Sequence, residues 1–124
     1  MTWLAVGFGA TLGAWLRWGL TNWMPAWQGS LPLGTLLANL GGGYLIGMAV
    51  AFFQAHPSLP LEWRLFLVTG FLGGLTTFST FSAESMLMLQ RGDYLWALLH
   101  AALHLLGALA LCIAGYATWR AIGT

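Results

Sequence analysis

The sequence predicts an all-α membrane protein with four transmembrane helices, and three observations support this prediction. First, 59% of the 124 residues are hydrophobic and only 6% are charged, whereas a soluble domain of this length needs many more charges on its surface. Second, four stretches can each supply the roughly 20 apolar residues that cross about 30 Å of hydrocarbon. Third, little sequence lies outside them. We therefore expect residues 1–124 to form a single transmembrane domain without a soluble module.

Helix-breaking residues separate the four predicted spans. The spans cover about residues 3–23, 33–54, 62–90 and 93–120. The loop Met24–Pro32 follows the first span, and the loop His56–Pro60 follows the second. The turn Arg91–Asp93 separates the third span from the fourth. The chain is thus predicted to be a multi-pass integral membrane protein.

Basic residues give no clear signal for the orientation in the membrane. Arg64 and Arg120 would lie on one side and Arg91 on the other, while Arg17 lies inside a span. This near balance permits insertion both ways up, and therefore an antiparallel homodimer of dual topology, as readily as a single orientation. The net charge is +1 and no basic patch is present, so nucleic acid is not an expected partner.

The most informative segment, Gly70–Ser82, lies inside the third predicted span. Three glycines loosen its backbone, and hydroxyl residues follow within seven positions: Thr76, Thr77, Ser79, Thr80 and Ser82. Backbone groups that leave a helix at membrane depth must be covered by protein or must line a cavity. Transport proteins place ion sites at such breaks. We expect this helix to be broken mid-membrane, around Gly73–Phe78, and to form a small-ion site there.

The broken segment offers groups of both electrostatic signs. Carbonyl oxygens freed around Gly73–Thr76 suit a hard cation. Phe78 and Phe81 project from the same side of the resumed helix, among hydroxyl groups. Packing is the simple interpretation, but aromatic ring edges carry partial positive charge and can meet an anion without holding it too tightly. We therefore predict a channel or carrier for a small ion, with an anion favoured.

Four further polar residues inside the predicted spans each have a structural and a functional interpretation. Thr35 and Asn39 share one face of the second span, and both are candidate pore residues. The Asn39 amide either donates to a neighbouring carbonyl or faces an anion in that pore. Arg17 and Glu84 must avoid lipid, and a salt bridge or an interfacial position would achieve this. Functionally, Arg17 suits an electropositive vestibule, and Glu84 suits a structural or gating role.

Two other spacings favour a structural interpretation. His100 and His104 are four residues apart and could bind a metal, but no acidic residue lies between them and no third ligand is apparent. Pore-facing hydrogen bonds or helix packing are therefore favoured over a zinc site. Glycines four residues apart permit close helix contact in lipid, and packing within the chain is favoured over a subunit contact. These pairs are Gly9 with Gly13 and Gly43 with Gly47.

Three segments resemble the Fluc fluoride channels, also called CrcB. Gly70–Ser82 resembles the family's third-helix signature, Gly34–Gly47 its second-helix motif and Gly9–Trp18 its first. Because length and layout also agree, the resemblance covers nearly the whole chain. It implies an antiparallel, dual-topology homodimer in the inner membrane of a bacterium. It also implies two pores that export fluoride passively and lower cytoplasmic fluoride, around a central Na⁺ that is structural rather than transported.

The resemblance also implies roles for individual residues. The backbone carbonyls of Gly73 and Thr76 would hold the Na⁺ ion. The family's pore and vestibule residues match Phe78, Phe81, Asn39, Ser79, Thr80, Arg17 and Glu84. Ala108 departs from the family because relatives carry a serine there, and His104, one turn earlier, is expected to substitute in part.

Three alternative functions remain open at this point. A fluoride/proton antiporter would need a titrating carboxylate, for which Glu84 is the candidate within a span. A small dual-topology multidrug transporter would need an acid in the first span, where only Arg17 is charged. A non-transporting subunit of a larger complex is the third alternative. An enzyme is not expected, because the sequence offers no nucleophile–base pair or metal cluster.

Overall fold

The computed structural model describes residues 1–27 and 30–123, which are mostly helical. Helix α1 (Thr2–Trp23) and helix α2 (Leu33–Ala55) are connected by two short antiparallel strands, β1 (Ala26–Trp27) and β2 (Leu31–Pro32). The sequence predicted a plain loop over Met24–Pro32, and the strand pair forms there because the chain reverses direction within a few residues. Gln28 and Gly29 of this predicted loop lie outside the described residues.

The remaining two helical rods each contain a π-helical segment. The first comprises α3 (Leu61–Arg64), η1 (Leu65–Leu72) and α4 (Gly73–Leu75), and after Thr76 and Thr77 it resumes as α5 (Phe78–Gln90). The second comprises α6 (Tyr94–Ala102), η2 (Leu103–Gly107) and α7 (Ala108–Ile122) without a break. The sequence did not predict either π segment, since one extra residue in a turn leaves little trace in an almost uniformly apolar stretch.

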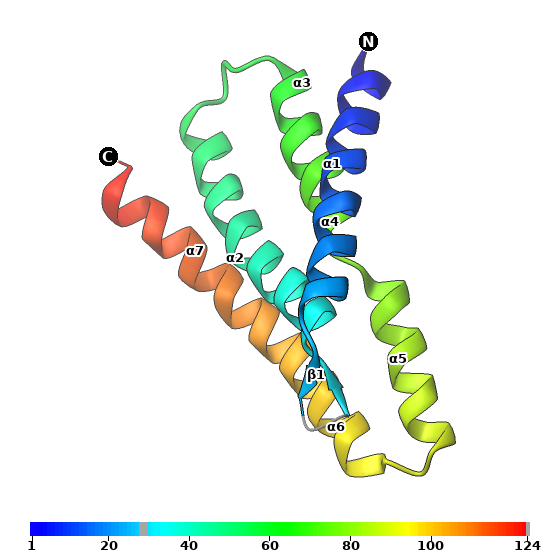
Figure 1. The fold of residues 1–124 in the computed structure, drawn as a ribbon. Helices are drawn as coiled ribbons and strands as arrows, with labels where there is room; N and C mark the ends of the chain where they lie inside the picture. Colours follow the sequence, from blue (N-terminus) through cyan, green and yellow to red (C-terminus); the bar gives the residue numbers. More distant parts are fainter. Residues whose placement is uncertain (28–29, 124) are drawn as a thin grey trace.

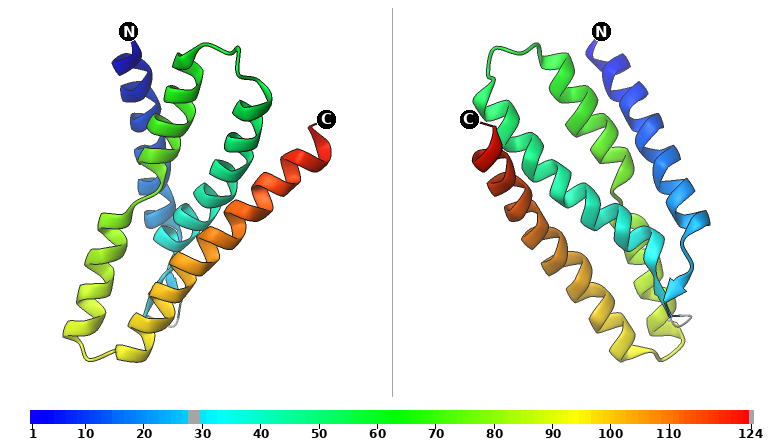
Figure 2. Two further views of the ribbon diagram at one scale, coloured as in Figure 1. Left: turned by 180° about the vertical axis from the view of Figure 1, so that it is seen from behind. Right: turned by 60° about the vertical axis from the view of Figure 1, so that its left-hand side comes forward.

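Packing between helices places the break at the centre of the molecule. Helix α2 lies along α7, and α1 lies along η1 and α4 (Figure 1). Helix α5 continues beyond the break toward the end of the molecule that carries the β1–β2 turn, where it meets α6 (Figure 2). Both chain termini lie at the opposite end (Figure 1). The break thus lies between the upper and lower halves of the third rod.

Glycines make the close contacts in both helix pairs. A Cβ atom on Gly13 would collide with the Phe71 carbonyl oxygen in η1, and one on Gly47 would collide with the Cys112 carbonyl oxygen in α7. Gly9 and Gly43 likewise face backbone atoms of the same chain. The expectation that these spacings serve packing within the chain is therefore confirmed. In lipid the hydrophobic effect does not drive helices together. Dispersion contacts between closely approaching backbones therefore stabilise these helix pairs.

Three helices of the described chain are long and apolar enough to cross a membrane: Leu33–Ala55, Leu61–Gln90 and Tyr94–Ile122. The chain is accordingly an all-α membrane protein. Helix α1 is not among these three candidates by composition, although it occupies the residues of the first predicted span. Its tryptophans, Arg17 and Asn22 make it less apolar than the other three helices.

Candidate ion-binding site

The break in the third rod consists of two residues in extended conformation. Thr76 has φ −88° and ψ 153°, and Thr77 has φ −151° and ψ 118°. Thr77 is the N-cap of α5, because its hydroxyl oxygen accepts a hydrogen bond from the Thr80 N–H at 3.1 Å. This side chain replaces a bond that the helix can no longer make, and it is the reason that α5 begins at Phe78. The break expected around Gly73–Phe78 is therefore present.

Asn39 of α2 satisfies the backbone groups that the break leaves open. Its Oδ1 accepts a hydrogen bond from the Thr77 N–H at 2.7 Å, and its Nδ2 donates to the Thr77 carbonyl oxygen at 3.0 Å. A single side-chain amide thus pairs with both polar groups of one residue, in the manner of a neighbouring strand. Because unpaired backbone groups are costly at membrane depth, Asn39 stabilises the broken conformation.

The same hydrogen bonds leave two carbonyl oxygens without their helical partners. In an unbroken helix the Gly73 carbonyl would accept from the N–H of Thr77, which instead donates to Asn39. The Thr76 carbonyl would accept from the N–H of Thr80, which instead donates to the Thr77 hydroxyl. Carbonyl oxygens at the carboxyl end of a half-helix are suitable ligands for Na⁺. The residues implied for a cation site thus fit an oxygen-liganded ion chemically.

Arg17 of α1 binds the carboxyl end of the same half-helix. Its Nε donates to the Gly74 carbonyl oxygen at 3.1 Å, and its side chain is half-buried. This contact is not the salt bridge that the sequence offered as one structural interpretation of Arg17. The guanidinium instead places a positive charge at the negative end of the half-helix, where it is stabilised by the helix dipole.

A cavity of about 530 Å³ opens beside the break. Its lining includes Asn39, Thr76, Phe78, Phe81 and His104. The structure therefore brings together residues that three different rods contribute. Other predicted site residues lie outside the lining: Thr35, Ser79, Thr80, Arg17 and Glu84.

Aromatic rings form one side of this cavity. The rings of Phe78 and Phe81 are 5.4 Å apart between centroids and tilted by 49°. Phe81 also packs on His100 and His104, with centroid distances of 4.9 Å and 4.8 Å. Phe78 is 79% exposed in the single chain, so its ring has no protein cover on one side. The sequence predicted that the edges of these rings meet an anion, and that stays a prediction.

The hydrogen bonds around His104 determine which ring nitrogen carries the proton. Thr77 fixes the orientation of the Asn39 amide, so Asn39 Nδ2 must be the donor in its 2.9 Å contact with His104 Nδ1. His104 Nδ1 is therefore an acceptor, and Nε2 bears the hydrogen. That Nε2–H is buried and has no hydrogen-bond partner among the described residues. It is a donor available to a small anion.

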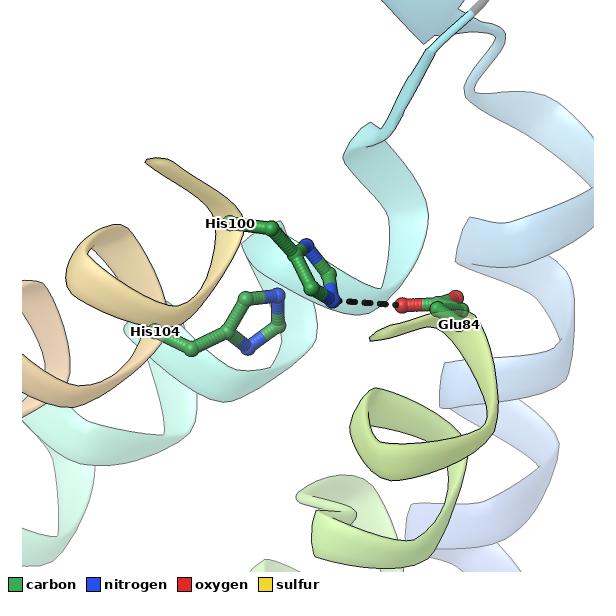
Figure 3. A group of neighbouring side chains, drawn as sticks. All are labelled: Glu84, His100 and His104. Atoms are coloured by element: carbon green, nitrogen blue, oxygen red, sulfur yellow. Dashed lines mark ion pairs between the residues drawn. The ribbon is translucent and has the colours of Figure 1, made fainter. Parts of the chain in front are cut away.

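Glu84, His100 and His104 form a second polar cluster next to Phe81 (Figure 3). His100 Nε2 lies 3.5 Å from Glu84 Oε1, and the Thr35 hydroxyl donates to Glu84 Oε2 at 2.6 Å. Thr35 thus contacts an acidic side chain rather than lining the cavity. The expectation that the two histidines lack a third ligand is wrong, because the fold brings Glu84 of α5 beside α6 and η2.

Comparisons with known proteins show the family of this chain. The family described as "CrcB-like protein, Camphor Resistance (CrcB)" matches residues 4–116. The chain belongs to the CrcB family. A protein of Cupriavidus metallidurans, named fluoride-specific ion channel FluC, is 60% identical over 122 residues, which cover 98% of this chain and 97% of the relative. A protein of Pseudomonas syringae with the same name is 53% identical over 121 residues, covering 98% and 95%.

Membership of the CrcB family distinguishes between a channel and an enzyme. These relatives are named ion channels, so the prediction of a channel rather than an enzyme is confirmed. The resemblance carried by Gly70–Ser82 is likewise confirmed at the level of the family. Within this CrcB chain, sequence reasoning missed the role of Thr77 as both N-cap and partner of Asn39. The only available signal was its place among the hydroxyl residues that follow the glycines.

Proposed function

We propose that this CrcB protein is a fluoride channel that exports fluoride passively across the bacterial inner membrane. The names of its close relatives support the choice of ion. The cavity beside the break supports a path, because it combines donors with aromatic rings and has no lysine or arginine among its described lining residues. A fixed cation in the lining would trap an anion, whereas hydrogen-bond donors and ring edges bind it weakly enough to release it.

The break between α4 and α5 is the observation that carries this proposal. It directs the amino end of α5, with the N–H groups of its first turn, toward the cavity, and amino ends of helices favour anions. His104, another lining residue, adds its Nε2–H. Fluoride would move along these donors and the edges of Phe78 and Phe81, and the hydroxyls of Ser79 and Thr80 would continue the polar track along α5. In this proposal Asn39 contacts fluoride only if one of its present hydrogen bonds opens.

An antiparallel homodimer of dual topology would complete the pores. Both termini lie at the same end of the molecule, which supports an even number of crossings and α1 as the fourth span (Figure 1). At 22 residues, α1 is long enough to cross about 30 Å of hydrocarbon. The uncovered ring of Phe78 and the exposed Gly73 support a second chain that covers this face. Arg17 and Glu84 would then set the potential of the vestibules.

A structural Na⁺ would occupy the break, held by the carbonyls of Gly73 and Thr76 from each of two chains. The ion would supply positive charge that compensates carbonyl oxygens left without N–H partners. Asn39 and the Thr77 hydroxyl contribute by drawing those N–H groups away. Arg17 contributes by occupying the intervening Gly74 carbonyl.

Anion efflux from proteoliposomes tests the proposal directly. The purified chain alone, reconstituted in liposomes loaded with fluoride or chloride, should release fluoride rapidly and chloride much more slowly. Equal rates for the two anions would overturn the proposed selectivity. Absence of any flux from a correctly folded preparation would favour a non-transporting subunit.

A fluoride/proton antiporter remains as a second candidate because of one observation. Glu84 and His100 are titratable, inside the membrane-spanning rods and 3.5 Å apart at their nearest polar atoms. A coupled carrier would drive fluoride against its gradient when a pH gradient is imposed. A channel would not, and this measurement separates the two.

A further inference from the structure

We propose that Glu84, His100 and His104 form a binding site for one divalent transition-metal ion per chain, with Zn²⁺ as the reference ligand. The three residues come from α5, α6 and η2, and one ligand atom from each lies within 4.8 Å of the other two. In Figure 3 the carboxylate and the two rings face a common point from two neighbouring helices. This site is distinct from the carbonyl oxygens of the break, which suit a hard monovalent cation.

Unsatisfied polar atoms in the cluster point to a ligand. Glu84 Oε1, His100 Nε2 and His104 Nε2, one atom from each residue, are buried without hydrogen-bond partners among the described residues. His100 is 0% exposed and His104 is 6% exposed. Each buried polar group without a partner costs about 1–3 kcal/mol. Several such atoms directed at one point are explained if a guest ion pairs with all of them.

The spacing of the cluster is close to that of a zinc site. Zinc bonds of about 2.0–2.1 Å in tetrahedral geometry place ligand atoms roughly 3.3 Å apart. His100 Nε2 and Glu84 Oε1 are already 3.5 Å apart, and the two imidazole centroids are 4.4 Å apart. Ligand atoms that now lie within 4.8 Å of one another must approach to about 3.3 Å, and rotation of the side chains can supply a change of this size. His104 lines the cavity, which supplies a route of entry for the ion.

The chemistry of the three ligands selects the class of metal. Two imidazoles and one carboxylate form a ligand set that zinc sites use with a fourth, open position. Mg²⁺ and Ca²⁺ prefer oxygen ligands alone, so they should not compete. The Thr35 hydroxyl holds Glu84 Oε2 at 2.6 Å and leaves Oε1 free for the metal, as supporting hydrogen bonds do in metalloproteins.

Metal binding would exchange one hydrogen bond for a coordinate bond at His104. A metal needs the lone pair of Nε2, so the ring must carry its hydrogen on Nδ1 instead, with no net change in protons on the ring. The hydrogen bond from Asn39 Nδ2 to Nδ1 must then open, which limits the affinity. The Nε2–H would no longer be available to an anion. Bound Zn²⁺ should therefore slow fluoride flux, a consequence that rests on the proposed function.

Direct binding measurements on the full chain in detergent, without fluoride, test the site itself. Calorimetric titration with Zn²⁺ should give one ion per chain, and Co²⁺ should give the visible absorption of a four-coordinate complex. His100→Gln and Glu84→Gln should each raise the Kd for Zn²⁺ by at least about tenfold. His56→Gln is the matched control, because His56 is exposed and its ring nitrogen already contacts the Phe52 carbonyl oxygen. This control should bind Zn²⁺ as the wild type does.

Two results would overturn the metal site. One is a Zn²⁺ affinity that His100→Gln and Glu84→Gln leave unchanged or that His56→Gln lowers equally. The other is the absence of a four-coordinate Co²⁺ spectrum in the wild-type chain, a measurement that does not depend on how any variant folds. A chain that binds Zn²⁺ as expected but releases no fluoride would support the metal site and overturn the proposed channel, so the two failures are distinguishable.

Discussion

Asn39 and His104 act together at the residue scale. The Asn39 amide makes three hydrogen bonds, two to the backbone of Thr77 and one to His104. The two bonds to Thr77 stabilise the break. The third bond places the hydrogen of the His104 ring on Nε2. One side chain therefore couples the conformation of the third rod to the position of the hydrogen on His104, a ring of the fourth rod that lines the cavity.

Replacing Asn39 with aspartate removes the hydrogen bonds that the amide donates while keeping the volume of the side chain. The carboxylate can still accept from the Thr77 N–H, but it cannot donate to the Thr77 carbonyl or to His104. We expect Asn39→Asp to lower fluoride efflux from proteoliposomes at least about tenfold, since a hydrogen bond from a buried group is worth about 1.4 kcal/mol or more once its partner is left unpaired. Asn22→Asp, on the exposed end of α1, is the control. Wild-type flux in Asn39→Asp would contradict this role.

The phenylalanine rings give a second prediction at this scale. Phe78→Ile and Phe81→Ile keep an apolar side chain but remove the electropositive ring edge, so each should sharply reduce fluoride efflux while the dimer still assembles. Phe8→Ile provides the control, because Phe8 is an exposed ring on α1. Efflux and size-exclusion chromatography are the measurements. If both variants conduct as the wild type does, ring edges have no part in the path.

At the scale of elements, close helix pairs hold the break in position. Helix α2 carries Asn39 and packs on α7 through Gly43 and Gly47, while α1 carries Arg17 and packs on η1 through Gly9 and Gly13. The two side chains that bind the broken segment thus stand on helices whose separation is set by glycine contacts. The site depends on these contacts, and of the four glycines only Gly43 also lines the cavity.

Gly47→Ala tests the glycine contacts. The added Cβ would collide with the Cys112 carbonyl oxygen, and overpacking of this kind costs about 1–3 kcal/mol. We expect the free energy of unfolding, measured by denaturation in mixed detergent micelles, to fall by that amount. Gly7→Ala is the control, because a Cβ there meets no atom of the chain within 4 Å and alanine favours helix. Equal stability of the two variants would contradict the contact.

On the scale of the whole molecule, the face beside the break is left exposed in a single chain. Phe78 is largely exposed beside the break, and the carbonyls of Gly73 and Thr76 lack their helical N–H partners. In the proposed dimer, this face would meet its copy around the central Na⁺. Fluoride flux would then depend on an ion that is not itself transported.

Removal of Na⁺ provides the prediction at this scale. Thorough replacement of Na⁺ by a large organic cation on both sides should abolish fluoride efflux, and return of Na⁺ should restore it, because the carbonyl oxygens then regain their partner. Thr76→Ala should have only a mild effect, since the proposed ligand of the ion is the backbone carbonyl of this residue. Undiminished efflux in the absence of Na⁺ would exclude a structural role for this ion.

Local features of the sequence were sufficient to predict much of the fold. Apolar stretches bounded by proline and glycine predicted the helices, because burial in hydrocarbon and the geometry of proline act within a few residues. The glycines and hydroxyls of Gly70–Ser82 predicted a broken helix for the same reason. The family and the channel class followed from that segment, and the comparisons confirmed them.

Contacts between distant segments were decided only by the tertiary structure. Asn39 had two possible partners in the sequence, and Thr77 proved to be one of them; Thr35 was assigned to a pore but bonds to Glu84. Glu84 and His100 are separated by the second half of α5, a turn and most of α6, so nothing in their spacing predicts a shared cluster. The sequence determines which segments become helices, because burial in hydrocarbon and the geometry of proline act locally. Which side chains meet depends on how the helices pack, and that depends on the whole chain at once.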